Sequence, residues 1–493
     1  MGNRADNKRS QTRKRLGQRR ARRSPIARVS ADYRIGHRSF TNLSFYAFGL
    51  SGVWTGIGSG ILPFKVLEAL ELGRVELLGY TLDKNGALGL ISLVGLSIAA
   101  VIQLLAGSLS DRDARPGRRL PYLLIGGLGL AVVTVLFGFA TSFVSLLVVF
   151  LAMHLFGNFG QGPANALIID HVPERRRGEA AGVLNLWRLL GAGILTVIVL
   201  QFMGNYDPVD GRQWMWYSII VVVVTLIGST IWTVTSLRPR HGLSIPSIGH
   251  TARPMEPPSP DAIRTKSDAP RPKKSPLNRN YVAFLVALAF SIAAMSSLQI
   301  YALFFLQDVV GLENPANGAD LIVIVIVVSA GLAVVPAGRL ADRLGRDRLF
   351  FFAGGSGAVG ATLLIFVSSI GPVLFIGVII GVAIGLFLTL TWTVANDLVT
   401  HADATHADAA RDLGYTSIAT LIGAVIARFA GVGIDIINDL SENLGYKAML
   451  VSVALAFVLS AVLLAKVVRD TLRIDELSTG VPQEPHEVVI APD

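Results

Sequence analysis

The sequence predicts an all-α membrane protein in which twelve transmembrane helices form two pseudo-repeated bundles of six. Three observations indicate this fold class. Of 493 residues, 52% are hydrophobic and 16% charged, whereas soluble domains carry about 25% charged residues. Apolar stretches recur that reach the roughly 20 residues a helix needs to cross hydrocarbon. A long polar segment divides these stretches into two sets, and motifs of the first set return in the second.

The predicted spans are separated by charged or turn-forming residues. They cover residues 41–65, 86–106, 121–141, 144–169, 179–203 and 214–236, then 281–306, 319–338, 348–370, 372–396, 412–434 and 446–468. The predicted organisation is a basic arm at 1–40, a first six-helix bundle at 41–236, a linker at 237–280, a second six-helix bundle at 281–470 and a tail at 471–493. The linker is basic and rich in proline, a composition that cannot bury a core.

Loop charge predicts the orientation. Cytoplasmic connections collect Lys and Arg, and the arm, the linker and the loops 111–119, 174–177 and 339–348 are basic, while the alternate connections are acidic on balance. Both termini are therefore predicted to be cytoplasmic. The arm alone holds thirteen Lys or Arg residues. We expect it to lie against anionic lipid headgroups and not to bind nucleic acid.

Several chemistries are excluded or disfavoured. The chain has no cysteine, which removes disulfides and thiolate catalysis. It lacks the glycine-rich phosphate loop of ATP-driven pumps and shows no convincing hydrolytic triad. The short segment from His401 to Asp408 has metal-ligand residue types without a partner cluster. We expect no enzyme activity, cofactor or metal.

An internal repeat supports a duplicated architecture. AGSLSDRDARPGRR from Ala106 returns in outline as AGRLADRLGRDR from Ala337, which matches Asp111 with Asp342 at an offset of 231 residues. GVLNLWRLLGAGI from Gly182 resembles GYTSIATLIGAVI from Gly414 at an offset of 232. Two such halves predict a solute cavity between them near the middle of the membrane, reached by alternating access.

The repeated G-x-L-[SA]-D-R pattern resembles the signature loop of the major facilitator superfamily. The resemblance implies a fold of twelve spanning helices and makes these loops conformational latches. The residues concerned are Gly107, Asp111, Arg112, Gly117, Arg118, Gly338, Asp342 and Arg343.

A finer resemblance extends over most of the chain. SDRDARPGRRLPYLL from Ser110, GPANALIIDHVP from Gly162 and ARDLG from Ala410 are similar to segments of the bacterial sugar:cation symporters (the glycoside-pentoside-hexuronide group) related to sucrose carriers. Sucrose carriers often have a basic residue where this chain has Asn165, which argues against sucrose itself.

Polar residues inside predicted spans are candidates for solute binding, because ionisable groups are costly in a membrane. His154, Asn158, Gln161 and Asn165 share one helical face. This stripe predicts either a wet cavity or hydrogen bonds between packed helices. Arg188 is the leading candidate, able to hold a carboxylate, a phosphate or paired hydroxyls, or else to pair with Asp170 or another acid. Trp187 and Trp392 are candidates to line or cap the same pocket.

Coupling to protons needs a group that changes charge between states. Asp170, Asp397 and His154 are the candidates, and the two aspartates equally suit a gate at the cytoplasmic helix ends. Arg428 and Asp435 lie seven residues apart on one helix face. We interpret them as an ion pair, with an outer gate as the alternative.

These observations favour a proton-coupled secondary transporter of a sugar, glycoside or similar small polar solute. The alternatives are a proton-coupled exporter of amphipathic compounds and a membrane scaffold or pigment-handling protein of the same fold. We expect a monomer in a bacterial cytoplasmic membrane.

Overall fold

The computed structural model describes residues 37–77, 79–112, 119–172, 176–237, 279–400 and 406–479. Twelve of its helical segments are long and apolar enough to cross a membrane. In the first half these are α3 (His37–Ser44), α4 (Tyr46–Thr55), η1 (Gly56–Ile61) and α5 (Leu62–Leu72), which together make the first span, then α6 (Lys84–Arg112), α7 (Leu120–Phe139), α8 (Phe143–His171), α9 (Arg177–Met203) and α10 (Arg212–Leu237).

The second half repeats this pattern. It contains α12 (Arg279–Asp308), α13 (Pro315–Leu344), α14 (Arg346–Leu363) with the short 3₁₀ turn η3 (Leu364–Phe366), α15 (Ile370–Thr400), α16 (His406–Asn438) and α17 (Leu444–Thr479). Each predicted span is matched by one of these segments. Residues 1–36 of the predicted arm, most of the linker and the end of the tail lie outside the described residues, and α3 begins within the last residues assigned to the arm.

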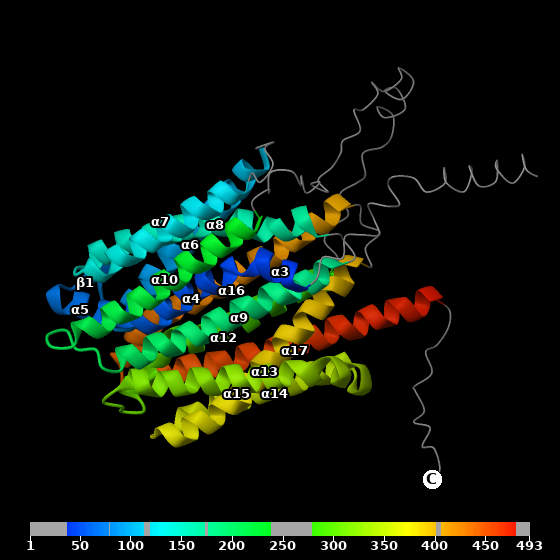
Figure 1. Cartoon of the computed structure of the whole chain (residues 1–493). Coiled ribbons are helices and arrows are strands. Elements are labelled where there is room, and N and C mark those ends of the chain that lie inside the picture. Colours follow the sequence, from blue (N-terminus) through cyan, green and yellow to red (C-terminus); the bar gives the residue numbers. More distant parts are fainter. Residues whose placement is uncertain are drawn as a thin grey trace, which may run out of the picture.

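The two ends of the molecule differ. One end carries a small antiparallel hairpin that the sequence analysis treated as a loop, in which β1 (Val75–Leu77) pairs with β2 (Tyr80–Leu82). We call this the hairpin end. At the opposite end, the terminal end, α3 and α12 begin and α10 and α17 finish (Figure 1). The helices run between these ends in alternating direction.

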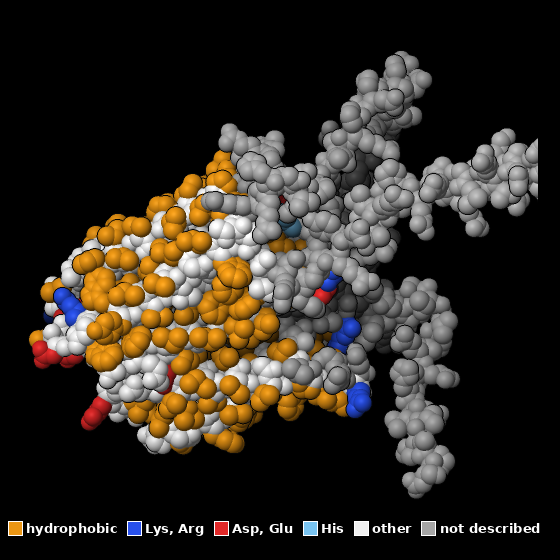
Figure 2. Space-filling model, viewed as in Figure 1, with side chains coloured by type: hydrophobic (Ala, Val, Ile, Leu, Met, Phe, Trp, Pro, Cys, Tyr) orange, Lys and Arg blue, Asp and Glu red, His pale blue; other side chains and the backbone are white. Residues whose placement is uncertain are grey.

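Side chains face two environments. Large apolar residues such as Val132, Phe139 and Leu332 are exposed on the outside of the helices. Figure 2 shows apolar side chains over the body of the molecule, with charged ones near its ends. An exposed apolar surface of this kind is expected where lipid replaces water as solvent.

Glycines let the helices of a half approach closely. A side chain at Gly52 or Gly60 would overlap Leu195 or Val199 of α9, so the first span packs directly on α9. The run from Gly56 to Ile61 forms a π turn, which carries one residue more per turn than an α-helix. The two halves meet where α6 packs on α16 and α9 on α13.

Candidate functional site

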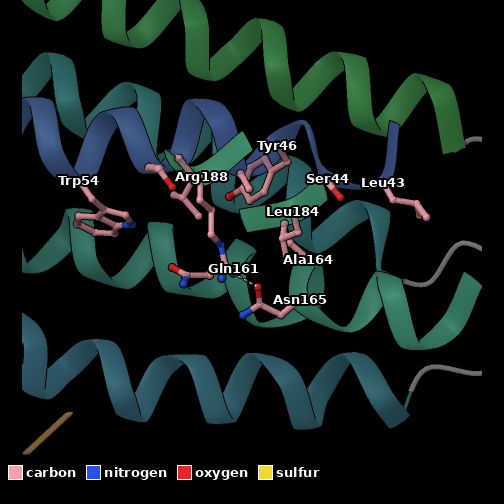
Figure 3. A pocket seen from close by; sticks show the side chains of 12 residues that line it. Leu43, Ser44, Tyr46, Trp54, Gln161, Ala164, Asn165, Leu184 and Arg188 are labelled. Atoms are coloured by element: carbon pink, nitrogen blue, oxygen red, sulfur yellow. Dashed lines mark hydrogen bonds between the residues drawn. The ribbon is translucent and has the colours of Figure 1, made fainter. Parts of the chain in front are cut away.

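A pocket lies inside the first half, between α4, α8 and α9. Its cavity volume is about 40 Å³. The first span contributes most of its wall, and α8 and α9 supply the most polar groups (Figure 3). The lining residues are Leu43, Ser44, Tyr46, Ala47, Leu50, Ser51, Trp54, Gln161, Ala164, Asn165, Leu184 and Arg188.

Arg188 is the charged group of this pocket. Its guanidinium NH2 donates a hydrogen bond of 2.6 Å to Oδ1 of Asn165. In Figure 3 the arginine extends from α9 towards Gln161 and Asn165 on α8. Its observed partner is an amide, in place of the acid considered in the sequence analysis. Burial of a guanidinium beside neutral groups leaves a positive charge in the pocket.

Two hydroxyl groups of the pocket have no hydrogen-bond partner. They belong to Ser44 and Tyr46, whose side chains are 2% and 1% exposed. Nearly all buried polar groups in proteins are hydrogen-bonded, so such a pair needs an explanation.

Close helix contacts hold these side chains in place. A Cβ at Gly191 would overlap the backbone of Phe48, so glycine allows α9 to lie directly against α4, less than one turn beyond Arg188. A Cβ at Gly160 would meet the hydroxyl of Tyr46. Pro163 stands inside α8 between the two polar residues of the pocket. It removes one helical N–H, which loosens the backbone there.

The predicted polar stripe on α8 serves two environments. Gln161 and Asn165 line the pocket, whereas His154 and Asn158 are buried nearer the hairpin end. The His154 ring stacks on Trp54 with centroids 4.5 Å apart and meets Phe150 edge-on at 4.9 Å. Asn158 donates to the carbonyl of His154. The hydrogen bond of Asn158 lies within α8, so neither His154 nor Asn158 shows the predicted hydrogen bond to another helix among the described residues.

Of the two candidate tryptophans, only Trp187 has a side chain within the described part of the structure. Trp187 packs edge-to-face with Phe45 and Phe48, at centroid distances of 4.8 and 5.8 Å, and is not among the residues that line the pocket. The side chains of Trp392 and Asp397 on α15 lie outside the described part of the structure.

Asp170 takes part in a contact at the terminal end. It forms an ion pair with Arg119 at the start of α7, and Arg119 also donates to the hydroxyl of Ser110 on α6 at 2.9 Å. This contact joins α6, α7 and α8 within the first half.

A polar network, here called the hairpin-end network, ties the halves together. Lys84 of α6 forms an ion pair of 2.5 Å with Asp308 of α12. The Tyr446 hydroxyl lies 2.7 Å from Asp308 Oδ2 and 3.1 Å from Asn85 Oδ1. The backbone N–H of Gly86 donates to Asp435 Oδ2 at 2.7 Å. The network thus consists of Lys84, Asn85, Gly86, Asp308, Asp435 and Tyr446.

The predicted Arg428–Asp435 ion pair is wrong. Arg428 donates to the carbonyls of Ser92 and Ala424, at 3.1 and 2.7 Å, while Asp435 accepts from Gly86. The two residues share a helix face, but α6 packs against that face and supplies a backbone partner to each. The contacts Arg428–Ser92 and Gly86–Asp435 cross between the halves, and the outer gate stays a prediction.

The candidate latch residues lie at the terminal end. Gly107, Asp111 and Arg112 fall in the last turns of α6, and Gly338, Asp342 and Arg343 in the last turns of α13. Gly117 and Arg118 are outside the described residues. The described residues contain no group of three or more His, Asp or Glu placed to hold a metal ion.

Sequence reasoning missed Ser44, Tyr46 and the hairpin-end network. Single hydroxyls on an apolar helix face give no periodic signal. Lys84 and Asp308 are far apart in the sequence, and each by itself looks like an ordinary charge at the end of a span.

Comparison with known proteins decides the family. A sequence model described as Major Facilitator Superfamily matches residues 40–427. The chain belongs to this superfamily of transporters. It is 27% identical to "Multidrug resistance protein MdtG" of Erwinia billingiae over 76% of this chain and 85% of the relative, and 24% identical to the protein of that name from Dickeya zeae over 85% and 92%.

Solved structures agree with this fold. A bacterial homologue of the human lysosomal transporter Spinster, in an inward-facing and unoccupied conformation, aligns with a TM-score of 0.60 at 16% identity, over 88% of this chain and 96% of that one. The nucleoside transporter NupG aligns at 0.57 and 15%, over 87% and 98%.

The superfamily predicted from the G-x-L-[SA]-D-R loops is thus confirmed. The relatives found are multidrug resistance proteins, so the finer assignment to the sugar:cation symporters has no support from them.

Proposed function

We propose that this transporter is a proton-coupled exporter of amphipathic small molecules. The observation that carries the proposal is a half-apolar, half-polar pocket on the terminal-end side of a molecule whose halves are joined at the hairpin end. The curated relatives named for multidrug resistance support the same solute class.

The proposed orientation in the membrane follows from charge. The described connections at the terminal end carry Arg119 and Arg176, and α14 begins there with Arg346 and Arg348. The connections at the hairpin end are acidic on balance, with Glu76, Asp83, Asp207 and Glu313 against Arg74. Basic connections face the cytoplasm, so we place the terminal end, both termini and the accessible side of the pocket there, in a bacterial inner membrane. A pocket loaded from the cytoplasm and released at the hairpin end exports its solute.

Asp435 is the group we propose for proton coupling. Its Oδ2 accepts the N–H of Gly86 across the halves, and its other oxygen is buried without a protein partner. Three titratable groups interact with Asp435, namely Asp83, Tyr301 and Tyr446. Lys84, Asp308 and Arg428 contact these groups in turn. A hydrogen bond to an ionised carboxylate is roughly twice as strong as one to a neutral acceptor. Protonation of Asp435 from outside therefore weakens the closed hairpin end.

Everted membrane vesicles test the transport proposal. With the terminal end outermost, an imposed proton gradient should drive accumulation of fluorescent amphiphiles, and a protonophore should abolish it. Vesicles without the protein are the control. Gradient-driven entry of labelled glycosides into right-side-out vesicles, with no effect on amphiphiles, would contradict export and favour the sugar alternative.

Asp435→Asn tests the coupling group. We expect gradient-driven transport to be lost while exchange of labelled for unlabelled solute continues, because exchange needs no net proton movement. Full gradient-driven transport by this variant would remove Asp435 from the coupling step.

A further inference from the structure

We propose that the pocket between α4, α8 and α9 binds an oxyanion, so that the transported solutes are acidic amphiphiles whose carboxylate, sulfonate or phosphate is held by Arg188. The inference rests on the transport function proposed above and narrows its solute class.

The charge of the pocket favours an anion. Among the twelve residues that line the pocket, Arg188 is the only Lys, Arg, Asp or Glu. Its described hydrogen bond goes to the neutral Asn165. A buried charge is costly unless an opposite charge compensates it. The solute is the component of the transport cycle that can supply that negative charge.

The arrangement of donors also fits an oxyanion. A guanidinium has five N–H donors in a planar fork that matches the oxygens of a carboxylate or phosphate. The hydroxyls of Tyr46 and Ser44 are buried in the same pocket without a partner. Each can donate one hydrogen bond, and the Gln161 amide can donate two more. In Figure 3, Arg188 runs beside Tyr46 towards Gln161, and Ser44 lies on the other side of the Tyr46 ring.

An amine in this position meets unfavourable contacts. Its positive charge would lie beside Arg188 in a low-dielectric site, where repulsion between like charges is much stronger than in water. No carboxylate stands among the lining residues to offset that repulsion. The pocket therefore discriminates against cations by charge as well as by the lack of a suitable acceptor.

The size and the walls of the pocket define the remainder of the solute. A volume of about 40 Å³ accommodates a head group and not a whole drug-sized molecule. Leu43, Ala47, Leu50, Trp54 and Leu184 form its apolar walls. An apolar body attached to a small acidic group matches this combination.

Binding of three related probes tests the inference. Thermal unfolding of the full chain in neutral detergent is followed with naphthylacetate, its neutral amide and naphthylethylamine. We expect the acid to raise the unfolding temperature and to bind at least about tenfold more tightly than the amide, a difference of roughly 1.4 kcal/mol. An amine that binds as tightly as the acid, or an acid that does not bind, overturns the proposal.

Substitutions assign the binding to the pocket. Arg188→Gln should remove the stabilisation by the acid, and Tyr46→Phe, which keeps the ring, should weaken it less. Arg469→Gln removes an exposed arginine at the terminal end of the second half and serves as the charge-matched control. If Arg188→Gln fails to fold, Arg188→Lys replaces it, with a weakened but measurable affinity expected. Unchanged binding of the acid to either Arg188 variant contradicts the site.

Further measurements distinguish a lipid head group from a free solute as the bound anion, and they test the anion site and the exporter function separately. Stabilisation by phosphatidylglycerol bicelles without added acid, lost in Arg188→Gln, identifies a lipid head group as the oxyanion. Acid binding that requires Arg188, without gradient-driven export, keeps the site and removes the exporter. Export of naphthylethylamine at equal rates by wild type and Arg188→Gln keeps the exporter and removes the anion site.

Discussion

The hairpin end and the terminal end of this transporter use polar groups differently. At the hairpin end, the pairs Lys84–Asp308 and Gly86–Asp435 join one half to the other. At the terminal end, the main described ion pair, Arg119–Asp170, joins helices of the same half. The hydrogen bonds between described residues of the two halves, including Gln201–Asp320 and Arg428–Ser92, lie towards the hairpin end.

The difference shows which contacts must break in a transport cycle. In alternating access, the contacts that join the halves at the hairpin end are present when that end is closed and absent when it is open. Their strength therefore sets the balance between the closed and open states. Contacts within a half persist through rigid-body motion and contribute to stability in both states. Mutations at the two ends should therefore produce different kinds of defect.

The largest effect is expected from locking the hairpin end. The chain has no cysteine, so Lys84→Cys combined with Asp308→Cys can be joined by a short, reductively cleavable bis-maleimide without background labelling. We expect nearly all transport to stop and to return after reduction. Each single-cysteine variant is the control, and undiminished transport in the cross-linked protein would show that this end need not open.

Wedging the same end open should have the next largest effect. A Cβ at Gly431 would overlap the carbonyl of Asn85 and lie 2.6 Å from the Tyr301 hydroxyl, whereas Gly433 faces open space. Overpacking costs about 1–3 kcal/mol. In Gly431→Leu the overlap with Asn85 of the other half exists only in the closed state, whereas the contact with Tyr301 lies within the second half and is common to both states. Maleimide labelling of a reporter cysteine at Lys84 should become roughly tenfold faster.

Gly433→Leu is the matched control for the wedge. It adds the same side chain on the same helix where no neighbour lies within 4 Å, so the labelling rate should stay that of the parent. Equal acceleration in both variants would mean that the added leucine acts through lipid contacts or misfolding.

At the terminal end we expect a loss of stability without a change of state. Asp170→Asn removes one charged partner of the Arg119 side chain, which is 6% exposed. The expected cost is about 2 kcal/mol, measured as a lower unfolding temperature, with unchanged labelling at Lys84. Asp347→Asn breaks the more exposed pair with Arg469 and should cost less than about 1 kcal/mol. Faster labelling in Asp170→Asn would show that the ends are coupled.

The smallest effect concerns a loop at the hairpin end. Hydrogen bonds from the backbone N–H groups of Asp210 and Val209 hold the pKa of the exposed Asp207 carboxyl below its usual range. A lowered pKa in the folded state gives stabilisation that is present above the ordinary aspartate pKa of about 4 and is lost as the pH falls through the folded-state value. Wild type should therefore unfold at a slightly higher temperature than Asp207→Asn at neutral pH.

That small advantage should disappear in acid. Thermal scans of both proteins from neutral pH to below the ordinary aspartate range measure it. A difference that grows on acidification would contradict the sign of the shift.

Sequence predicted the fold more fully than the site. A helix needs about 20 apolar residues to cross the hydrocarbon core, and a run of that length, such as 348–370, can be recognised in a single sequence. The site depends on which helices meet. Helical periodicity places Gln161 and Asn165 on one face, and the cost of burying a charge marks Arg188 as a candidate. The three pocket residues could therefore be predicted from the sequence, but the contact between Arg188 and Asn165 could not.

The errors had a common cause. Arg428 and Asp435 were paired because they share a face of α16, yet α6 supplies each with a backbone partner. The hydroxyls of Ser44 and Tyr46 became notable only when the structure showed them buried beside Arg188. Partners from distant segments, and backbone partners above all, leave no mark in a single sequence.

The pocket belongs entirely to one half, and this has a consequence for energetics. All lining residues belong to the first half, so a head group bound between α4, α8 and α9 would keep the same neighbours when the second half moves as a rigid body. A ligand with equal affinity for two states shifts neither population. Under the proposed mechanism, release on the far side would then depend on dilution and on the coupling gradient, and uphill transport would not require weaker binding of the solute to Arg188.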